Sequence, residues 1–267
     1  MFKSYYGLTK NPFDKSFSEH NPFYSNDHKE MTARLAYLNN IRGIGVFTSP
    51  PGFGKTYALR CFAKSIDRNL NEVAYLCLST VSTMEFYRQF CDALGIDAPH
   101  GKPAMFRVIQ DRLYHLLKEK KKPFLLIFDE AHELSAPILK DLKMILNHDF
   151  DSINCFTLAL AGEPHLNNIL EKPIHEALRQ RIVIHYNFTG LSDSETELYI
   201  RHKLNIAGAS ESILGTGTIP AIIGYTHGCS RLIDNLMNEA LSLGAQLEKP
   251  SIDTDLILAA VNNLALA

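Results

Sequence analysis

Hydrophobic residues along the chain alternate between short unbroken runs and longer stretches with helical spacing. The runs predict strands buried on both faces at Ile44–Thr48, Val73–Ser79, Phe124–Asp129, Cys155–Ala161 and Ile182–Phe188. The stretches between them predict helices at Thr56–Leu70, Ser82–Leu94, Pro103–Lys120 and Ser135–Asn147. This alternation predicts an α/β fold in which helices flank a five-stranded parallel sheet.

The strand pattern disappears after residue 190. A Ser192…Glu195 capping box begins a predicted helix over Ser192–Ala207. Further helices are predicted at Thr218–Tyr225, Arg231–Leu247 and Thr254–Leu264. We therefore expect an N-terminal aromatic arm with a leading helix over residues 1–43, an α/β domain over 44–190 and a small all-helical domain over 191–267.

The first predicted strand ends in a loop that reads S-P-P-G-F-G-K-T over Ser49–Thr56. Gly52 and Gly54 allow the backbone to curl so that consecutive N–H groups face phosphate oxygens, and the following helix adds the positive end of its dipole. Lys55 is predicted to reach the β- and γ-phosphates of a nucleotide, and the Thr56 hydroxyl is predicted to ligate Mg²⁺. The predicted nucleotide-binding residues are Ser49, Pro50, Pro51, Gly52, Phe53, Gly54, Lys55, Thr56 and Tyr57.

This loop departs from the P-loop pattern at one fixed position, where Ser49 replaces the opening glycine. We expect the serine to be tolerated if its backbone does not require a glycine conformation. An ordinary strand–turn–helix connection is the alternative interpretation of the loop taken alone.

A second motif supports the nucleotide interpretation. The segment Phe124–Glu130 reads F-L-L-I-F-D-E, an apolar run that ends in two carboxylates, which are costly to bury without partners. Asp129 is predicted to support the Mg²⁺ held by Thr56, and Glu130 is predicted to act as the general base that activates water. An acidic helix cap after a strand is the alternative, which the order of the two motifs disfavours. Together the motifs predict an ATPase with ATP and Mg²⁺ as cofactors.

Composition limits the remaining possibilities. The 267 residues are 46% hydrophobic and 21% charged, as in soluble globular proteins, and no run is long and apolar enough to span a membrane, so we expect a cytoplasmic protein. The formal net charge of −2 argues against a basic surface throughout, although a local basic face is enough to bind DNA. Five widely spaced cysteines are predicted to be reduced core thiols: Cys61, Cys77, Cys91, Cys155 and Cys229.

A P-loop domain followed by a helical domain is typical of AAA+ ATPases, and three arginines fit positions used in such proteins. Arg179 or Arg181, in the segment L-R-Q-R-I before the last predicted strand, is expected to be an arginine finger aimed at a neighbouring subunit's γ-phosphate. Arg231 lies in the first turn of a predicted helix, where a cation opposes the helix dipole, so we expect it to meet the γ-phosphate of bound ATP. The alternatives are an exposed basic turn and a plain surface arginine.

Several segments together resemble the ExeA/GspA-type AAA+ ATPases. They are Tyr5–Phe13, Pro22–Glu30, Ser49–Thr56, the run L-L-I-F-D-E-A-H, Ala161–Leu166 (A-G-E-P-H-L), L-R-Q-R-I and Gly228–Leu236 (G-C-S-R-L-I-D-N-L). The resemblance spans nearly the whole chain and implies a P-loop AAA+ domain followed by a helical lid domain. That family includes secretion ATPases and a larger set of transposition helpers, similar in role to TnsC, TniB, IstB and MuB.

The sequence ends at Ala267 without the membrane segment and peptidoglycan-binding region of the secretion members, so we expect the transposition branch. The resemblance then implies a protein that self-associates into a ring or filament, binds double-stranded DNA without sequence preference when ATP is bound, and recruits or activates a transposase. One alternative is a secretion-associated ATPase that acts on a cell-envelope protein complex. A second is a regulatory nucleotide switch with little turnover.

Three further residues lie near the predicted nucleotide site. Glu163 occupies the sensor-1 position of the family, where an amide or hydroxyl is usual and a carboxylate would repel phosphate. Thr80 is a candidate switch that acts on Glu130, with a structural role as the alternative. The letters D-E-A-H also spell a helicase box, but no second RecA-like half follows, so we expect His132 to begin the next helix or to contact nearby loops.

The aromatic arm and the basic residues are the least specific features. By the resemblance, Phe2–Phe23 is expected to wrap the nucleotide domain near the adenine, with aromatics that merely cover a core as an equal alternative. DNA-contact candidates are Arg107, Arg112 and the Lys140–Lys143 region, and spacing selects none of them. The charge run Lys118–Lys122 is expected to be a solvated helix end, with nucleic-acid contact as the less supported alternative.

Overall fold

The computed structural model describes residues 2–15, 22–77, 82–148 and 153–265, which fall into two compact units. The sheet unit comprises Glu30–Pro51 and Lys55–Phe188. The helical unit comprises Met1–Lys29, Gly52–Gly54 and Thr189–Ala267. Residues up to Lys29, part of the region 1–43 that we expected to form an aromatic arm with a leading helix, therefore group with the helices after Thr189.

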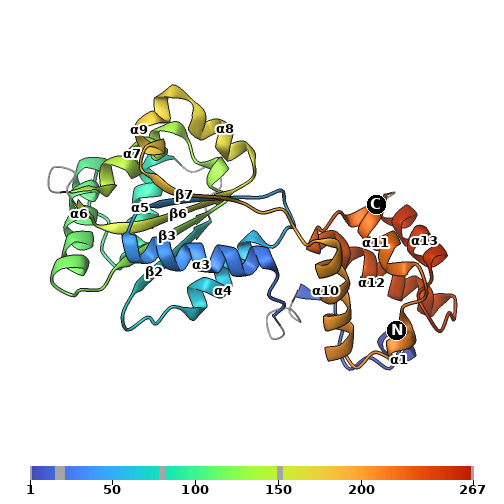
Figure 1. The fold of residues 1–267 in the computed structure, drawn as a ribbon. Helices are drawn as coiled ribbons and strands as arrows, with labels where there is room; N and C mark the ends of the chain where they lie inside the picture. The colour runs from blue at the N-terminus through green and yellow to red at the C-terminus, as the bar shows by residue number, and fades with distance from the viewer. Residues whose placement is uncertain (1, 16–21, 78–81, 149–152, 266–267) are drawn as a thin grey trace. The chain divides into compact units, whose positions relative to one another are not determined.

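A five-stranded parallel sheet forms the centre of the sheet unit, with the strand order β2-β3-β6-β1-β7 (Figure 1). The strands are β1 (Ile44–Thr48), β2 (Glu72–Cys77), β3 (Phe124–Asp129), β6 (Phe156–Gly162) and β7 (Ile182–Asn187). The three inner strands β3, β6 and β1 are buried at every position, because each is covered on both faces, as their unbroken apolar runs predicted. The predicted α/β fold with a five-stranded parallel sheet is confirmed.

Helices cover both faces of this sheet. On one face, α3 (Asn26–Ile41) and α4 (Lys55–Ser65) pack on a cluster that includes Phe47 and Ile127. On the other face lie α5 (Thr83–Ala93), α6 (Lys102–Lys118) and α7 (Ala136–Leu146). Adjacent strand residues point to opposite faces, so neighbouring positions such as Ile127 and Phe128 serve different cores.

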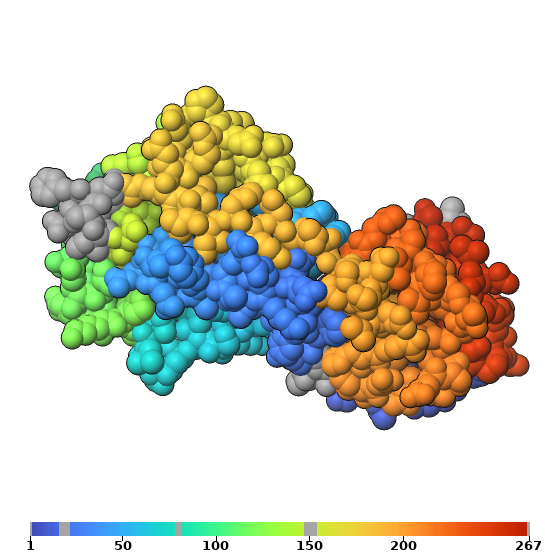
Figure 2. Space-filling model, viewed as in Figure 1, coloured from blue at the N-terminus to red at the C-terminus, as the bar shows by residue number. Residues whose placement is uncertain are grey.

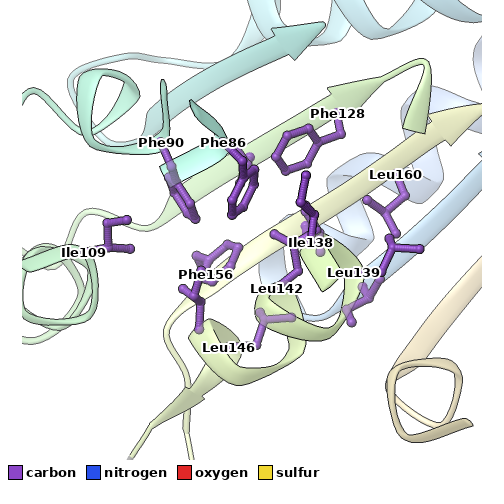
Figure 3. Close-up of a cluster of buried hydrophobic side chains, with 14 of the residues drawn as sticks. Phe86, Phe90, Ile109, Phe128, Ile138, Leu139, Leu142, Leu146, Phe156 and Leu160 are labelled. Atoms are coloured by element: carbon purple, nitrogen blue, oxygen red, sulfur yellow. The ribbon is translucent and has the colours of Figure 1, made fainter. Parts of the chain in front are cut away.

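The core beneath α5, α6 and α7 is rich in aromatic rings (Figure 3). Phe86 from α5 lies 5.9 Å from Phe128 of β3, measured between ring centroids, and Phe90 lies 6.0 Å from Phe156 of β6. Phe86, Phe90, Phe128 and Phe156 are fully buried, and each contributes a large apolar area to the stability of the layer. Phe128 directly precedes Asp129, so this packing anchors the end of β3 from which site residues extend.

On the face of the sheet that α3 and α4 cover, α3 reaches the surface beside the edge strand β7 (Figure 2). The Arg34 guanidinium lies 4.9 Å from the centroid of the Tyr186 ring, which is a cation–π contact between helix and strand.

Several local predictions differ from the structure. The helix predicted over Thr56–Leu70 ends at Ser65, because Asp67 Oδ1 accepts the Asn69 N–H at 2.8 Å in a local turn that competes with the helix. The elements of the sheet unit that the pattern did not predict are α8 (His165–Glu171), α9 (Glu176–Arg179), the 3₁₀ turns η1 (Ala131–Glu133) and η2 (Pro173–His175), and the short pair β4 (Asn147–His148) and β5 (Ile153–Asn154). These elements are all short, so they contain too few residues to show a period.

The helical unit contains α1 (Phe2–Tyr5), α10 (Asp193–Ile206), η3 (Glu211–Ile213), α11 (Thr218–Thr226), α12 (Ser230–Gln246) and α13 (Thr254–Ala265). The capping box predicted at the start of α10 is present, since the Ser192 and Glu195 side chains each accept the other residue's backbone N–H. Helices predicted from the sequence therefore occur in this region with bounds that differ by a few residues.

The N-terminal segment forms part of the core of the helical unit. Leu8 and Phe13 are buried among side chains of α10, α12 and α13. The Asn238 amide donates to the Phe13 carbonyl at 3.2 Å, and the Tyr6 hydroxyl donates to the Lys249 carbonyl at 3.0 Å. These residues therefore cover the core of the helical unit, as the core-covering alternative expected, and a position of the arm near the adenine stays a prediction.

A buried ion pair lies in the same core. Lys203 of α10 is 1% exposed, and its Nζ lies 2.7 Å from Asp234 Oδ1 of α12. The Tyr199 hydroxyl donates to both carboxylate oxygens, at 2.9 and 3.1 Å. The ammonium also lies 5.4 Å from the centroid of the Phe13 ring, so the pair joins the N-terminal segment to two helices.

The cysteines are free, but they are not all core thiols. Cys91, Cys155 and Cys229 are buried as predicted, whereas Cys61 is half-buried and Cys77 is exposed at the end of the edge strand β2. The helices within the described residues include none that is both long and apolar enough to span a membrane.

Candidate functional site

The carboxyl ends of the central strands bring the two sequence motifs together. β6 lies between β1 and β3, and Gly162 at its end is opposite Thr48 of β1. The Gly162 carbonyl accepts hydrogen bonds from the Ser49 N–H at 3.2 Å and from Lys55 Nζ at 2.8 Å. Lys55 is only 6% exposed, so its charge is weakly screened and would attract a phosphate strongly.

Asp129 is the centre of a hydrogen-bonded group of oxygens. Its Oδ2 accepts from the Thr56 hydroxyl at 2.6 Å and from the Tyr75 hydroxyl at 2.7 Å, and its Oδ1 accepts from the Glu130 N–H at 3.0 Å. Burial and the bond to Asp129 raise the pKa of Tyr75 above its ordinary value, so this hydroxyl stays a donor. Hydroxyl and carboxylate oxygens are ligands that Mg²⁺ prefers, so Thr56 and Asp129 fit a divalent metal.

Glu130 occupies an unusual backbone conformation directly after β3. Its φ is 54°, in the left-handed region that non-glycine residues rarely adopt, and it precedes the 3₁₀ turn η1. Such strain is typical of functional sites. Its side chain is 42% exposed, and Oε2 lies 3.5 Å from His132 Nδ1. A partly exposed carboxylate beside Asp129 is accessible to water, as a general base requires.

The loop glycines have the backbone conformation that the sequence predicted. Gly52 has φ 86° and Gly54 has φ 96°, both in the region that favours glycine, whereas Ser49 is not among the residues with positive φ. The serine at the opening position is therefore compatible with the loop. This curled backbone fits a phosphate group, since a Cβ at either glycine would be strained.

Other residues of the loop lie in different surroundings. Pro50 is half-buried and Pro51 is exposed, while Tyr57 in α4 has its ring centroid 5.9 Å from the Arg60 guanidinium. Phe53 belongs to the helical unit and packs so closely on Gly190 that a Cβ there would lie 2.6 Å from the ring.

Arg231 also belongs to the helical unit. It is exposed in the first turn of α12, and its N–H donates to the Gly52 carbonyl at 3.1 Å. The Ser230 hydroxyl donates to the same carbonyl at 2.9 Å. The predicted contact of Arg231 with a γ-phosphate stays a prediction.

The two candidate arginine fingers lie just before the amino end of β7, whereas Lys55 follows the carboxyl end of β1. Arg179 ends α9, is exposed, and donates from Nη1 to the Glu171 carbonyl at 2.9 Å. Arg181 is partly exposed and directly precedes β7, whose amino end pairs with the amino end of β1. The structure therefore does not bring either arginine to the Lys55–Asp129 group of its own chain. A finger that serves a neighbouring subunit stays a prediction.

Of the predicted sensor and switch residues, Glu163 donates its N–H to His132 Nδ1 at 3.2 Å, and Thr80 lies outside the described residues. His132 does not begin α7 but lies in η1 and contacts the segment after β6, which agrees with the expected loop contact.

A group of polar side chains around Asn167 of α8 was not predicted from the sequence. The Asn167 amide donates to Thr48 Oγ1 at 3.4 Å, and its oxygen lies 2.9 Å from His185 Nε2. Thr48 also hydrogen-bonds Asn187, at the carboxyl end of β7. The available signal was the position of Thr48 and Asn187 at strand ends, where polar residues follow apolar runs.

Comparison with known proteins agrees with this geometry. Residues 39–170 match the family model for the AAA domain. The chain contains an AAA-type P-loop ATPase domain. The match includes Lys55, Thr56, Asp129 and Glu130, so nucleotide binding with a divalent metal belongs to this AAA domain, while Arg179, Arg181 and Arg231 lie beyond the matched residues.

A relative and two solved structures resemble this chain. The general secretion pathway protein A of Aeromonas hydrophila is 28% identical over 244 residues, which cover 90% of this chain and 44% of that protein. The chain thus spans less than half the length of this relative. The structure of Cdc6p from Pyrobaculum aerophilum matches with a TM-score of 0.69 at 15% identity, covering 92% of this chain and 68% of Cdc6p. The Aeropyrum pernix ORC1 protein in complex with DNA matches with a TM-score of 0.67 at 12% identity, covering 96% of this chain and 70% of ORC1.

Proposed function

We propose that this AAA domain hydrolyses ATP with Mg²⁺. Lys55 and the curled backbone at Gly52 and Gly54 bind the phosphates, and Thr56 and Asp129 hold the metal. Bound Mg²⁺ would neutralise charge on the phosphates during hydrolysis. Glu130 accepts the proton of the attacking water.

The contact between Thr56 and Asp129 is the observation that carries this proposal. A 2.6 Å bond joins residues 73 positions apart, one from each sequence motif, and Lys55 lies next to Thr56 in the chain. An ordinary strand–turn–helix connection does not require this contact, whereas a metal–nucleotide site does. Tyr75 supports the same carboxylate from the neighbouring strand.

Replacing Lys55 with alanine tests the nucleotide site. We expect Lys55→Ala to weaken Mg–ATP binding by at least about tenfold and to abolish turnover, because a charge-assisted phosphate contact contributes about 1.5–3 kcal/mol. Affinity is measured with a fluorescent ATP analogue and turnover by phosphate release. Lys64→Ala, at an exposed lysine of the same helix, is the control and should behave like the unaltered protein. Equal affinity and turnover in the two variants would refute the proposed site.

We further propose that the protein self-associates into a ring or filament on double-stranded DNA when ATP is bound, and that it recruits or activates a transposase. The ExeA/GspA-type resemblance of the sequence supports assembly. The ORC1 neighbour, which shares the fold, was solved in complex with DNA, and this supports a DNA-binding function. An arginine finger at Arg179 or Arg181, at the edge of the sheet away from Lys55, suits a site completed by a second subunit.

A basic hollow in the sheet unit is the best-supported DNA-contact candidate. It is lined by Arg42, Leu117, Lys118, Lys121 and Pro123, near the amino ends of β1 and β3. Three cations around one concavity suit a phosphate backbone, whose binding is mainly electrostatic. By contrast, Arg112 is half-buried and donates to the Leu94 carbonyl at 3.3 Å, so it is a poor candidate. Arg107 and Lys140 are exposed on α6 and α7 and remain candidates.

DNA binding is tested by fluorescence anisotropy on two duplexes of unrelated sequence, with and without ATP. We expect both duplexes to bind alike, only with ATP, and affinity to fall with salt. A double variant, Lys118→Ala with Lys121→Ala, should weaken binding to both and reduce the salt slope by about two, one for each lost phosphate contact. Lys64→Ala is again the control.

Assembly is followed by negative-stain microscopy of the same samples. Hydrolysis and assembly that ignore DNA entirely would overturn this proposal. Recruitment is tested by pull-down of the transposase encoded nearest to this chain, with ATP and DNA present.

A secretion-associated ATPase that acts on a cell-envelope protein complex is the second candidate. It is favoured by the 28% identity to general secretion pathway protein A over 90% of this chain. Turnover stimulated by cell-envelope fractions and unchanged by DNA would support this function over the first.

A further inference from the structure

A second cluster of possible metal ligands lies beside the ATPase residues. His132, Glu163 and His165 each offer one ligand atom, and these atoms all lie within 4.8 Å of one another. His132 follows β3, while Glu163 and His165 follow β6, the neighbouring strand. Parallel pairing of the two strands therefore brings the three side chains to one point of the sheet edge.

The His132 ring is held in a fixed orientation. Its side chain is 8% exposed, and Nδ1 accepts the Glu163 N–H at 3.2 Å. Gly162 makes this position possible, because a Cβ there would lie 3.1 Å from both the backbone N and Nδ1 of His132. Since Nδ1 is turned toward this backbone, Nε2 is the nitrogen available to a ligand. The ring meets His165 edge to face, with centroids 4.8 Å apart.

We propose that His132, Glu163 and His165 bind a transition-metal ion of the Zn²⁺ type, with Nε2 as the ligand atom of His132. Two imidazoles and one carboxylate are a donor set that such ions use, with water in the fourth position. Mg²⁺ prefers oxygen ligands, so this cluster and the Thr56–Asp129 pair select different metals. Glu133 Oε1, 3.5 Å from His132 Nε2, adds negative charge beside the bound cation.

A metal bound to this cluster can also change the contacts of the Glu130 side chain. This step depends on the general-base role proposed above. Coordination through Nε2 requires the lone pair of that nitrogen, so the ring proton resides on Nδ1. The protonated Nδ1 can no longer accept the Glu163 N–H, so that hydrogen bond breaks, and Nδ1–H instead donates toward Glu130 Oε2, 3.5 Å away in the metal-free structure. A carboxylate–histidine–metal arrangement of this kind is common in metal sites. A hydrogen bond from Nδ1–H would hold the Glu130 side chain against the ring and away from the attacking water, so bound metal should slow hydrolysis.

Isothermal titration of the full chain with ZnCl₂, without nucleotide or Mg²⁺, tests the binding step. We expect one Zn²⁺ per chain, and His165→Ala should weaken the affinity by at least about tenfold, because even partners one shell outside a metal contribute 10–100-fold. Glu163→Gln removes a carboxylate ligand at nearly constant shape and should weaken binding similarly. His165 is exposed, so its replacement should leave the fold intact, which thermal melting checks.

His100→Ala is the matched control, because His100 is exposed in a loop outside the cluster. Equal Zn²⁺ affinity in His165→Ala and His100→Ala, or no binding by the unaltered chain, would overturn the site. Because nucleotide is absent, this result does not depend on the ATPase proposal.

A second assay adds buffered free Zn²⁺ to the chain at saturating Mg–ATP. Slower turnover in the unaltered chain and in His100→Ala, but not in His165→Ala, would support the link to Glu130. Equal slowing in all three proteins would overturn that link.

Discussion

Replacing Glu130 with glutamine is expected to lower the ATP turnover number about 10²- to 10⁴-fold, the usual contribution of a general base. Glutamine has nearly the same shape but cannot accept the proton of the attacking water. Lys55, Thr56 and Asp129 are unchanged, so nucleotide affinity should stay within a few-fold of the original value. Phosphate release under saturating ATP and the affinity for a fluorescent nucleotide measure the two quantities separately.

Glu133→Gln is the matched control for this experiment. Glu133 is exposed in the same 3₁₀ turn and also lies 3.5 Å from the His132 ring, yet it does not follow Asp129 directly. Its replacement should leave turnover nearly unchanged. If the unaltered protein binds ATP but has negligible turnover that Glu130→Gln does not change, a regulatory nucleotide switch is the better description.

The second large effect is expected on stability. Lys203→Ala should lower the free energy of unfolding of the helical unit by about 3 kcal/mol, the low end for a buried pair, because it removes the counter-charge of Asp234, whose side chain is 22% exposed. The Tyr199 hydroxyl would still donate to the carboxylate but cannot neutralise it. Urea unfolding at neutral pH, followed by circular dichroism, gives the change, with each unit's transition fitted separately where the two are resolved.

Two comparisons make this result specific. Lys249→Ala removes an ion pair with Asp253 at the same 2.7 Å distance, but both side chains are at least a third exposed, so the loss should be about 1 kcal/mol or less. The double replacement Lys203→Met with Asp234→Leu should cost less than Lys203→Ala, because it buries no uncompensated charge. A Lys203→Ala protein as stable as Lys249→Ala would contradict the importance of the buried pair.

The sequence predicted the parts of the site that depend on local spacing. Gly52 and Gly54 have the predicted backbone, and Thr56 and Asp129 meet because parallel strands place both motifs at the same edge of the sheet. The five-strand core could also be predicted, because unbroken apolar runs are characteristic of strands with both faces covered.

The remaining contacts depend on pairings that no local pattern encodes. Tyr75 reaches Asp129 because β2 is the edge strand beside β3, and strand order is not visible in the sequence. Asn167 reaches Thr48 from a helix too short to predict. The packing of the N-terminal segment was not predictable for a related reason, since Phe13 packs on residues more than 180 positions later in the chain.

The grouping of the chain ends has a consequence for biosynthesis. The sheet unit lies within residues 30–188, so its strands and covering helices can assemble on the ribosome while the later helices are still being translated. The helical unit takes Leu8 and Phe13 from the beginning of the chain and α13 from near its end. Its core must therefore wait until α13 has been translated, and Leu8 and Phe13 remain exposed to chaperones until then.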